Sequence, residues 1–226
     1  MKFFIVSCFL VILGTSLAEL EKRSALKRVV RSTFGQLNNG FTEQMKTLII
    51  ANCVENGFVG IEDDLRQTFA DFDVCSAKMK LYVDTKENYL KNIEECSVEP
   101  TKKIKSCLTK KQSYFPDYLL NMVRKQVELG YDDRDIIITD LTPCMKIFEN
   151  ADVASSYLTC LSDTAKRTND TARIPDTVEI MCSRALPAVK CMTDILDKEC
   201  TPYPLVKKYI QDNLKANEYP CQQKYD

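Results

Sequence analysis

The sequence contains no histidine and no tryptophan. Without histidine, catalysis by a Ser-His-Asp or Cys-His arrangement is excluded, and the commonest metal ligand of proteins is missing. Without tryptophan, there is no indole ring to stack on a bound sugar. Carboxylate pairs can also act as general acid and base, but no pattern places two of the 32 acidic residues across a cleft. We therefore assign them to solvated helix faces.

Close cysteine pairs and glycine-rich loops are absent as well. No Cys-x-x-Cys pair occurs, so neither a zinc knuckle nor a thioredoxin-type redox site is expected. There is no phosphate-binding loop and no Gly-x-Ser-x-Gly motif, and Ser24-Ala-Leu-Lys27 matches Ser-x-x-Lys without its companion motifs. The acidic stretch 132–140 fails as a calcium loop, because Arg134 and Pro143 occupy positions that need oxygen ligands. We predict no catalytic residue, no metal, no cofactor and no enzyme.

The first 18 residues have the pattern of a secretory signal peptide. Lys2 precedes an apolar run that is too short to span a bilayer, and Ser16 and Ala18 are small residues at a cleavage site. We predict cleavage after Ala18, with Lys22-Arg23 as a second, dibasic processing site. No later segment is apolar enough to anchor the chain, so residues 19–226 are predicted to be secreted and not to span a membrane.

Removal of residues 1–18 takes Cys8 away and leaves ten cysteines. An even number in a secreted chain is what complete disulfide pairing requires. The net charge of −1 and the predicted secretion argue against a nucleic-acid partner. The length fits one domain or two closely packed helical halves. The predicted disulfide cysteines are Cys53, Cys75, Cys96, Cys107, Cys144, Cys160, Cys182, Cys191, Cys200 and Cys221.

Apolar residues recur at helical spacing, and strand-like alternation is scarce. Stripes run through residues 26–37, 61–79 and 90–96, and the second of these stripes points Cys75 toward the core. Asp84-Thr-Lys-Glu87 resembles a capping box at the start of the third helix. These patterns predict an all-α, disulfide-braced bundle of about eight to eleven helices.

Glycine and proline residues divide these helices. Asn56-Gly57 and Gly60 end the helix before residue 61, and Pro100 is predicted to open a short helix. The stretch 132–140 contains three successive isoleucines, which favour a short extended piece. Further helix starts or kinks are expected at Pro143, Pro175, Pro187, Pro202 and Pro204.

The cysteine pairing is narrowed by helix geometry, since each residue of a helix rises about 1.5 Å. In a helical hairpin, two bonded cysteines should lie at similar distances from the turn. Cys144 and Cys160 flank a turn and are candidates to pair with each other. Cys53 and Cys75 lie at unequal distances from the turn at residues 56–60 and are not expected to pair. Cys182 and Cys191 pair if the helix breaks at Pro187, and face opposite sides if it does not. The stretches Cys96–Cys107 and Cys182–Cys191 are also alike, through either duplication or chance.

Two basic stretches are candidates for an interaction surface, although a solvated helix face is the commoner explanation. Their members are Lys22, Arg23, Lys27, Arg28 and Arg31 in the first stretch, and Lys102, Lys103 and Lys105 in the second. Asn169 begins the only Asn-x-Ser/Thr sequon, in a polar stretch before Pro175. We predict glycosylation there.

From Cys53 onward, the order and spacing of the cysteines resemble the 27 kDa hemolymph glycoprotein family of insects. The matching stretches are LIIANCVENG, FDVC, CSVEPTKKIKSCL, MCSRALPAVKCMTDILDKEC and the closing YPC, within residues 44–221. The resemblance implies a secreted, cysteine-rich helical protein of insect body fluids with no established catalytic site. Typical members carry a further cysteine pair, which is missing here between Cys75 and Cys144. Only the ten cysteines carry over from the family.

Together these features favour a secreted, non-enzymatic protein of an insect fluid, hemolymph or saliva, that binds an extracellular macromolecule. The alternative is an extracellular carrier of small apolar ligands such as lipids, because helical shells braced by disulfides can enclose an apolar cavity. A carrier would hold that cavity between its helices, whereas a macromolecular binder would have a solid core and an exposed patch.

Overall fold

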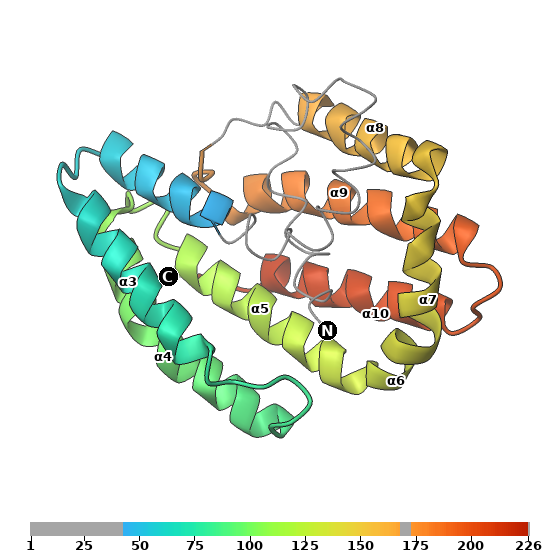
Figure 1. Cartoon of the computed structure of the whole chain (residues 1–226). Coiled ribbons are helices and arrows are strands. Elements are labelled where there is room, and N and C mark those ends of the chain that lie inside the picture. Colours follow the sequence, from blue (N-terminus) through green and yellow to red (C-terminus); the bar gives the residue numbers. More distant parts are fainter. Residues whose placement is uncertain (1–42, 168–172, 226) are drawn as a thin grey trace.

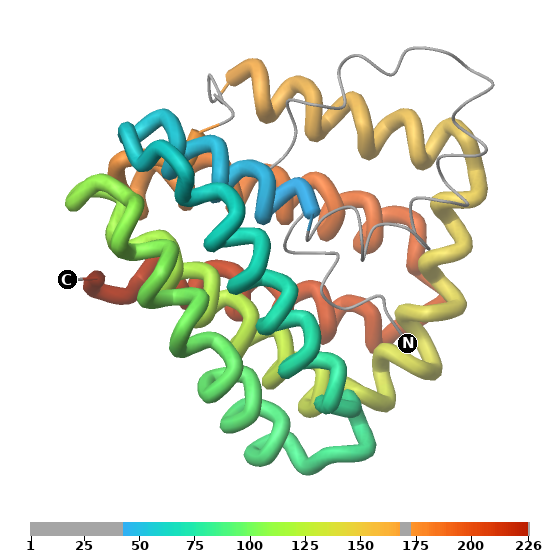
Figure 2. Tube along the Cα trace, turned by 60° about the vertical axis from the view of Figure 1, so that its left-hand side comes forward, coloured from blue at the N-terminus to red at the C-terminus, as the bar shows by residue number. Residues whose placement is uncertain are grey.

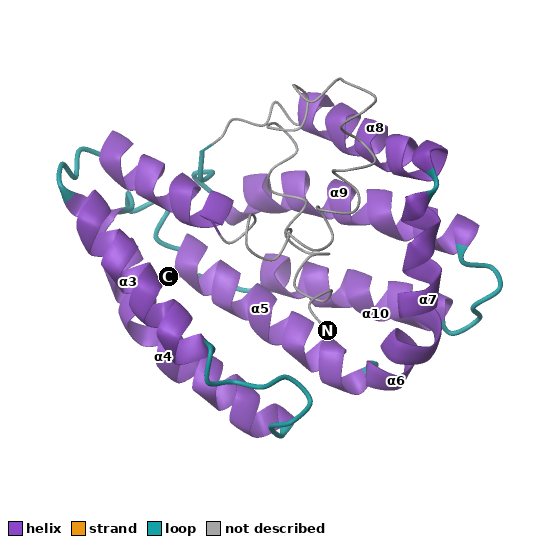
Figure 3. Cartoon of the chain, viewed as in Figure 1, coloured by secondary structure: helices purple, strands orange, loops and turns teal. Residues whose placement is uncertain are grey.

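The computed structural model describes residues 43–167 and 173–225 of the chain, and within these ranges it contains helices, turns and no strand (Figure 3). The all-α, disulfide-braced bundle is thereby confirmed. Residues 43–55 are helical and are followed by eight α-helices, α3 to α10. The predicted signal peptide, the stripe at residues 26–37 and the first basic stretch lie outside the described residues.

The helices are arranged in a row in which the last helix of the sequence lies in the middle (Figure 1). Each helix packs on the next one of the row, and α10 therefore lies between α5 and α9. Figure 2 shows α3 and α4 side by side along their length. In spatial order the row is α3 (Ile61–Ser76), α4 (Lys86–Cys107), α5 (Phe115–Asp132), α10 (Val206–Glu218), α9 (Val178–Glu199) and α8 (Ala151–Arg167).

Short helical pieces complete the fold. Four of them connect α5 to α8, and the fifth follows α10 and packs against α5 and α9. They are α6 (Arg134–Ile136), the π-helix η1 (Ile137–Leu141), α7 (Thr142–Cys144), the 3₁₀-helix η2 (Met145–Glu149) and the 3₁₀-helix η3 (Tyr219–Gln222).

Buried apolar side chains form two hydrophobic clusters. One gathers around residues 45–53, α3 and the first half of α5, and the other around η1, α8 and α10. Helices α5 and α9 contribute to both clusters and so join the two ends of the molecule. One domain, or two closely packed helical halves, remains our prediction.

Five disulfides include all ten predicted cysteines, and four of these disulfides are nested in the same way. In each nest an outer bond encloses an inner one, and the inner bond joins two consecutive long helices of the chain. The fifth bond ties α9 to η3. The nests are Cys53–Cys107 around Cys75–Cys96 and Cys144–Cys200 around Cys160–Cys191, and the fifth bond is Cys182–Cys221.

The predicted Cys144–Cys160 pair is wrong, since each of these residues bonds a residue of α9 or its C-cap. Cys182 and Cys191 do not pair either, because α9 continues through Pro187 and the two side chains leave the helix on different sides. This is the second of the two arrangements that the sequence left open. The expected lack of a Cys53–Cys75 bond is confirmed.

The disulfides also show that the two similar stretches, Cys96–Cys107 and Cys182–Cys191, do not occupy equivalent positions. By disulfide position, the counterpart of Cys96 and Cys107 is the pair Cys191 and Cys200, not Cys182 and Cys191. Cys75 lies on α3 as expected, but it and Cys96 are only partly buried, so this disulfide is not a core bond.

Two predictions about local structure are wrong. Pro100 lies inside α4 and does not open a new helix. Proline costs a helix interior about 3 kcal/mol, and disulfides at Cys96 and Cys107 fix α4 on both sides of it. The stretch 132–140 is helical and not extended, because Ile136 and Ile137 are buried in the second cluster.

The cap of α4 is also displaced by one residue from the prediction. Thr85, and not Asp84, is the N-cap, and its side chain accepts a hydrogen bond from the Asn88 backbone N–H. The side chain of Asp84 instead accepts a hydrogen bond from the backbone N–H of Lys80, at the start of the preceding turn.

Candidate functional site

The second basic stretch is largely occupied by ion pairs within the molecule. Lys103 contacts Asp64 of α3 at 2.5 Å, and Lys105 contacts Asp117 of α5 at 2.6 Å. Lys102 is exposed and, within the described residues, forms no ion pair. This stretch therefore attaches α4 to its two neighbours and leaves one lysine for a partner. The sequon at Asn169 lies outside the described residues, so its glycosylation stays a prediction.

The aspartates of the stretch 132–140 serve helix packing. Asp132 forms an ion pair with Lys86 of α4, and Asp140 accepts a hydrogen bond from the backbone N–H of Leu205, at the start of α10. Asp133, the C-cap of α5, pairs with Lys208 of α10. The structure thus assigns three of the four aspartates to fastening α5 and η1 to other helices.

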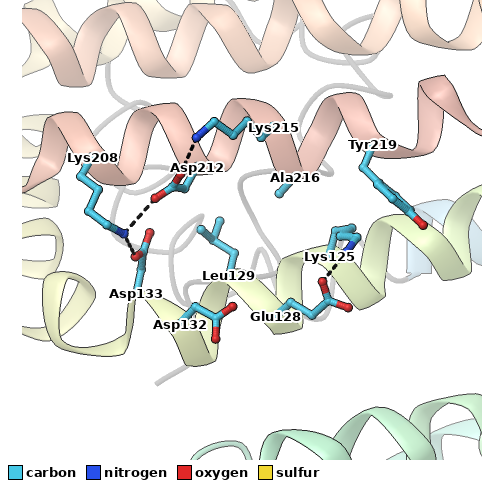
Figure 4. A pocket seen from close by; sticks show the side chains of 10 residues that line it. All are labelled: Lys125, Glu128, Leu129, Asp132, Asp133, Lys208, Asp212, Lys215, Ala216 and Tyr219. Carbon is cyan, nitrogen blue, oxygen red and sulfur yellow. Dashed lines mark hydrogen bonds and ion pairs between the residues drawn. The ribbon is translucent and has the colours of Figure 1, made fainter.

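A hollow of about 430 Å³ lies between α5 and α10, and we call it the α5–α10 groove (Figure 4). Charged side chains of both signs form most of its wall, and one tyrosine closes one end. Its lining residues are Lys125, Glu128, Leu129, Asp132, Asp133, Lys208, Asp212, Lys215, Ala216 and Tyr219.

At the Lys208 end of the groove, the negative charges are more deeply buried than the positive ones. The side chain of Asp133 is 2% exposed, whereas that of Lys208 is 56% exposed. Lys208 also donates to Asp212 at 2.8 Å, and Lys215 donates to the same carboxylate at 3.0 Å. The carboxylates therefore lie deeper than the ammonium groups that cover them.

These contacts shift the pKa values of both kinds of group. Hydrogen bonds to Asp133 and then to Asp212 raise the pKa of Lys208 to about 12. The hydrogen bond from Lys208 lowers the pKa of Asp212 below its ordinary value, against the opposing effect of burial. Both groups are held in their charged forms at neutral pH.

One oxygen of the groove has no partner. Lys208 uses Oδ1 of Asp133, and Oδ2 of the same carboxylate is buried without a hydrogen bond. A buried acceptor left without a donor is unfavourable by about 1–3 kcal/mol, and more when it is charged. Gln126 Oε1 and Asn213 Nδ2 are also unsatisfied, at the buried contact of the same two helices. Several buried polar groups thus meet where α5 packs on α10.

At the other end of the groove, Lys125 bonds Glu128 at 2.5 Å and lies 4.4 Å from the centre of the Tyr219 ring. A cation over an aromatic face is attracted by the ring quadrupole. This end is therefore occupied by a side chain of the protein itself.

A second feature is the turn at residues 56–60, which we call the braced turn. Phe58 and Val59 are 42% and 94% exposed, between Gly57 and Gly60, whose φ angles are +92° and +85°. The backbone N–H of Gly57 bonds the carbonyl of Val54, and that of Phe58 bonds the carbonyl of Cys53. These two bonds are those of a Schellman motif, which needs a left-handed residue such as glycine at the position of Gly57.

The braced turn is fixed to two other segments of the chain. Cys53 forms its disulfide with Cys107, and the Asn56 side chain donates to the carbonyl of Cys107 at 3.1 Å. The Asn52 side chain accepts a hydrogen bond from the backbone N–H of Ile174, also at 3.1 Å. The two exposed apolar side chains are thus held on a cross-linked support.

Neither feature was predicted from the sequence. Gly57-Phe-Val-Gly60 places two large apolar residues between turn glycines, and this signal could have indicated an exposed apolar tip. No comparable signal marks the groove, since Asp133 and Lys208 are 75 residues apart and meet only because α10 packs beside α5.

Comparisons with known proteins found no match among protein-family models, among curated proteins or among solved structures. In the part of the chain that the structure describes, no helix is both long and apolar enough to cross a membrane. The resemblance to the insect hemolymph glycoproteins therefore remains an expectation from the sequence.

Proposed function

We propose that this protein is a secreted, non-enzymatic protein of an insect body fluid, hemolymph or saliva, that acts by binding another macromolecule. Secretion is supported by the signal pattern of residues 1–18 and by the five disulfides, which form and persist in oxidising compartments. The insect setting rests on the order and spacing of the cysteines from Cys53 to Cys221.

The braced turn is the observation that carries the proposal. Val59 is 94% exposed, and the burial of such an apolar side chain against a partner is favourable. The disulfide and the Schellman motif hold the turn in one conformation, which reduces the entropy lost on binding. Of the acidic residues beside the turn, Glu55 pairs with Arg173 and Glu62 with Arg66, so neither calls for a basic partner. The fitting partner is a protein with an apolar pocket.

The alternative, a carrier of apolar ligands, gains no support from the groove, because that hollow is lined mainly by charged groups. The groove would expose a lipid chain to carboxylates and ammonium groups, which lose hydration when an apolar ligand covers them.

Photo-crosslinking tests the proposal. The photoreactive residue p-benzoylphenylalanine replaces Val59, and in a matched control it replaces Val83, a 75% exposed valine of another turn. Both variants are added to the protein's source fluid and irradiated. We expect one discrete protein adduct from position 59 alone, and the purified partner should bind wild type but not the Phe58→Ser, Val59→Ser variant. Equal adducts from both positions, or none from position 59, would overturn the proposal.

A further inference from the structure

We propose that the α5–α10 groove binds a guanidinium group, which enters between Asp133 and Asp212 in place of the Lys208 ammonium. The groove is distinct from the braced turn, and this inference does not depend on the proposed function.

The unpartnered oxygen of Asp133 indicates what kind of group fits. The carboxylate is 2% exposed and offers two oxygens, but the ammonium of Lys208 bonds only Oδ1. An ammonium is a compact point charge, whereas a guanidinium is a planar fork whose N–H groups pair with both oxygens of one carboxylate. A guanidinium therefore satisfies the oxygen that Lys208 leaves free.

The position of Lys208 allows the exchange. Its side chain is more than half exposed and reaches the groove from the rim, so its ammonium can return to water when another cation arrives. Figure 4 shows the carboxylates of Asp133, at the C-cap of α5, and of Asp212, in α10, approaching this ammonium. Both remain available to a guest, and Lys215 still neutralises part of the charge of Asp212.

The rest of the groove has the apolar surface and the volume that a planar guanidinium group and its alkyl stem need. Leu129 and Ala216 supply apolar contacts between the two charged ends, and the hollow of about 430 Å³ exceeds the volume of one guanidinium with its alkyl stem. The guanidinium group can come from either of two ligands, a free alkylguanidine or an arginine side chain of a polypeptide.

The test uses the whole protein and records backbone amide shifts by NMR with three probes. These are ethylguanidinium, ethylammonium, and an acetylated, amidated Gly-Gly-Arg-Gly-Gly peptide. We expect saturable shifts at Asp133 and Asp212, with ethylguanidinium binding about tenfold more tightly than ethylammonium. A peptide that binds about tenfold more tightly than ethylguanidinium identifies a polypeptide source, and equal affinities identify the free guanidine.

Three variants then separate a binding site from a purely structural ion pair. Lys208→Gln removes the competing ammonium and should bind ethylguanidinium several-fold more tightly. Lys208→Arg supplies the guanidinium from the chain itself and should abolish binding, and Asp133→Asn should weaken it at least tenfold. Lys190→Gln breaks the exposed Lys190–Asp194 pair of α9 and should change nothing.

The inference is overturned if wild type shows no saturable shift, if Lys208→Gln binds no more tightly than wild type, or if Lys208→Arg binds as wild type does. Lys208→Arg keeps both carboxylates and the positive charge, so its result does not depend on that of Asp133→Asn. The photo-crosslinking result at Val59 is independent of all of these outcomes.

Discussion

The ion pair of Asp133 and Lys208 should respond unequally to the loss of each partner. Lys208→Met leaves a carboxylate that is 2% exposed without its cation, whereas Asp133→Asn leaves an ammonium that is already 56% exposed and still bonds Asp212. Stranding a buried charge costs about 3–5 kcal/mol. Because water can reach the position of Lys208, we expect Lys208→Met to lower the free energy of unfolding by about 3 kcal/mol, the lower end of this range. We expect about 1 kcal/mol, the contribution of one hydrogen bond, for Asp133→Asn.

Urea unfolding at pH 7 measures both free energies of unfolding, and Lys190→Gln on α9 provides the matched surface control with a change below about 0.5 kcal/mol. Equal losses for the two variants, or a larger loss for Asp133→Asn, would refute the argument from burial.

The pKa of Lys208 predicts how this difference depends on pH. Its value in the folded protein is raised from 10.5 to about 12, so the stabilisation is fully present below pH 10.5 and is lost as pH rises through about 12. The gap in stability between wild type and Lys208→Met should therefore stay constant from pH 7 to 10 and narrow above that range. A gap that grows at alkaline pH would contradict this assignment.

Three further predictions concern the turn, a disulfide and a buried tyrosine. Gly57→Ala should cost about 1–2 kcal/mol in urea unfolding, because the φ of +92° disfavours a side chain although nothing lies within 4 Å of the added Cβ; an unchanged stability would refute the strain argument. Replacing Cys160 and Cys191 by serine opens a 31-residue loop and should lower the free energy of unfolding by about 3–4 kcal/mol, measured in the same way. A loss below 1 kcal/mol would show that packing alone holds α8 on α9. Burial raises the pKa of Tyr157 well above its ordinary value of 10.0, so wild type should lose stability as pH rises above 10 more steeply than Tyr157→Phe. Identical alkaline profiles in thermal unfolding would contradict the burial of the phenol.

The helices could be predicted from the sequence because amphipathic spacing is a local property. The stripe of Ile61, Leu65 and Phe69 needs only the 3.6-residue period to indicate α3, and the glycines at 57 and 60 mark where the preceding helix ends. Local signals were wrong where tertiary contacts override them. Three isoleucines favour a strand, but burial of Ile136 and Ile137 in the second hydrophobic cluster holds them in helices.

The pairing of the cysteines and the groove are both consequences of the long-range arrangement. Cys144 bonds Cys200 and not Cys160, because the C-terminal end of α9 lies beside α7. Lys208 meets Asp133 because α10 is inserted between α5 and α9, which no spacing within either segment indicates. For Pro187 the sequence offered two arrangements, and the continuous helix is the one that the structure contains.

Disulfide mapping tests most directly the central claim that a fully cross-linked frame holds the braced turn and the groove. The protein from its own source is alkylated without reduction, digested, and analysed by mass spectrometry. We predict no alkylated cysteine at positions 53–221 and five linked peptide pairs. Free thiols, or a Cys144–Cys160 or Cys182–Cys191 bond, would contradict the frame. The predicted pairs are Cys53–Cys107, Cys75–Cys96, Cys144–Cys200, Cys160–Cys191 and Cys182–Cys221.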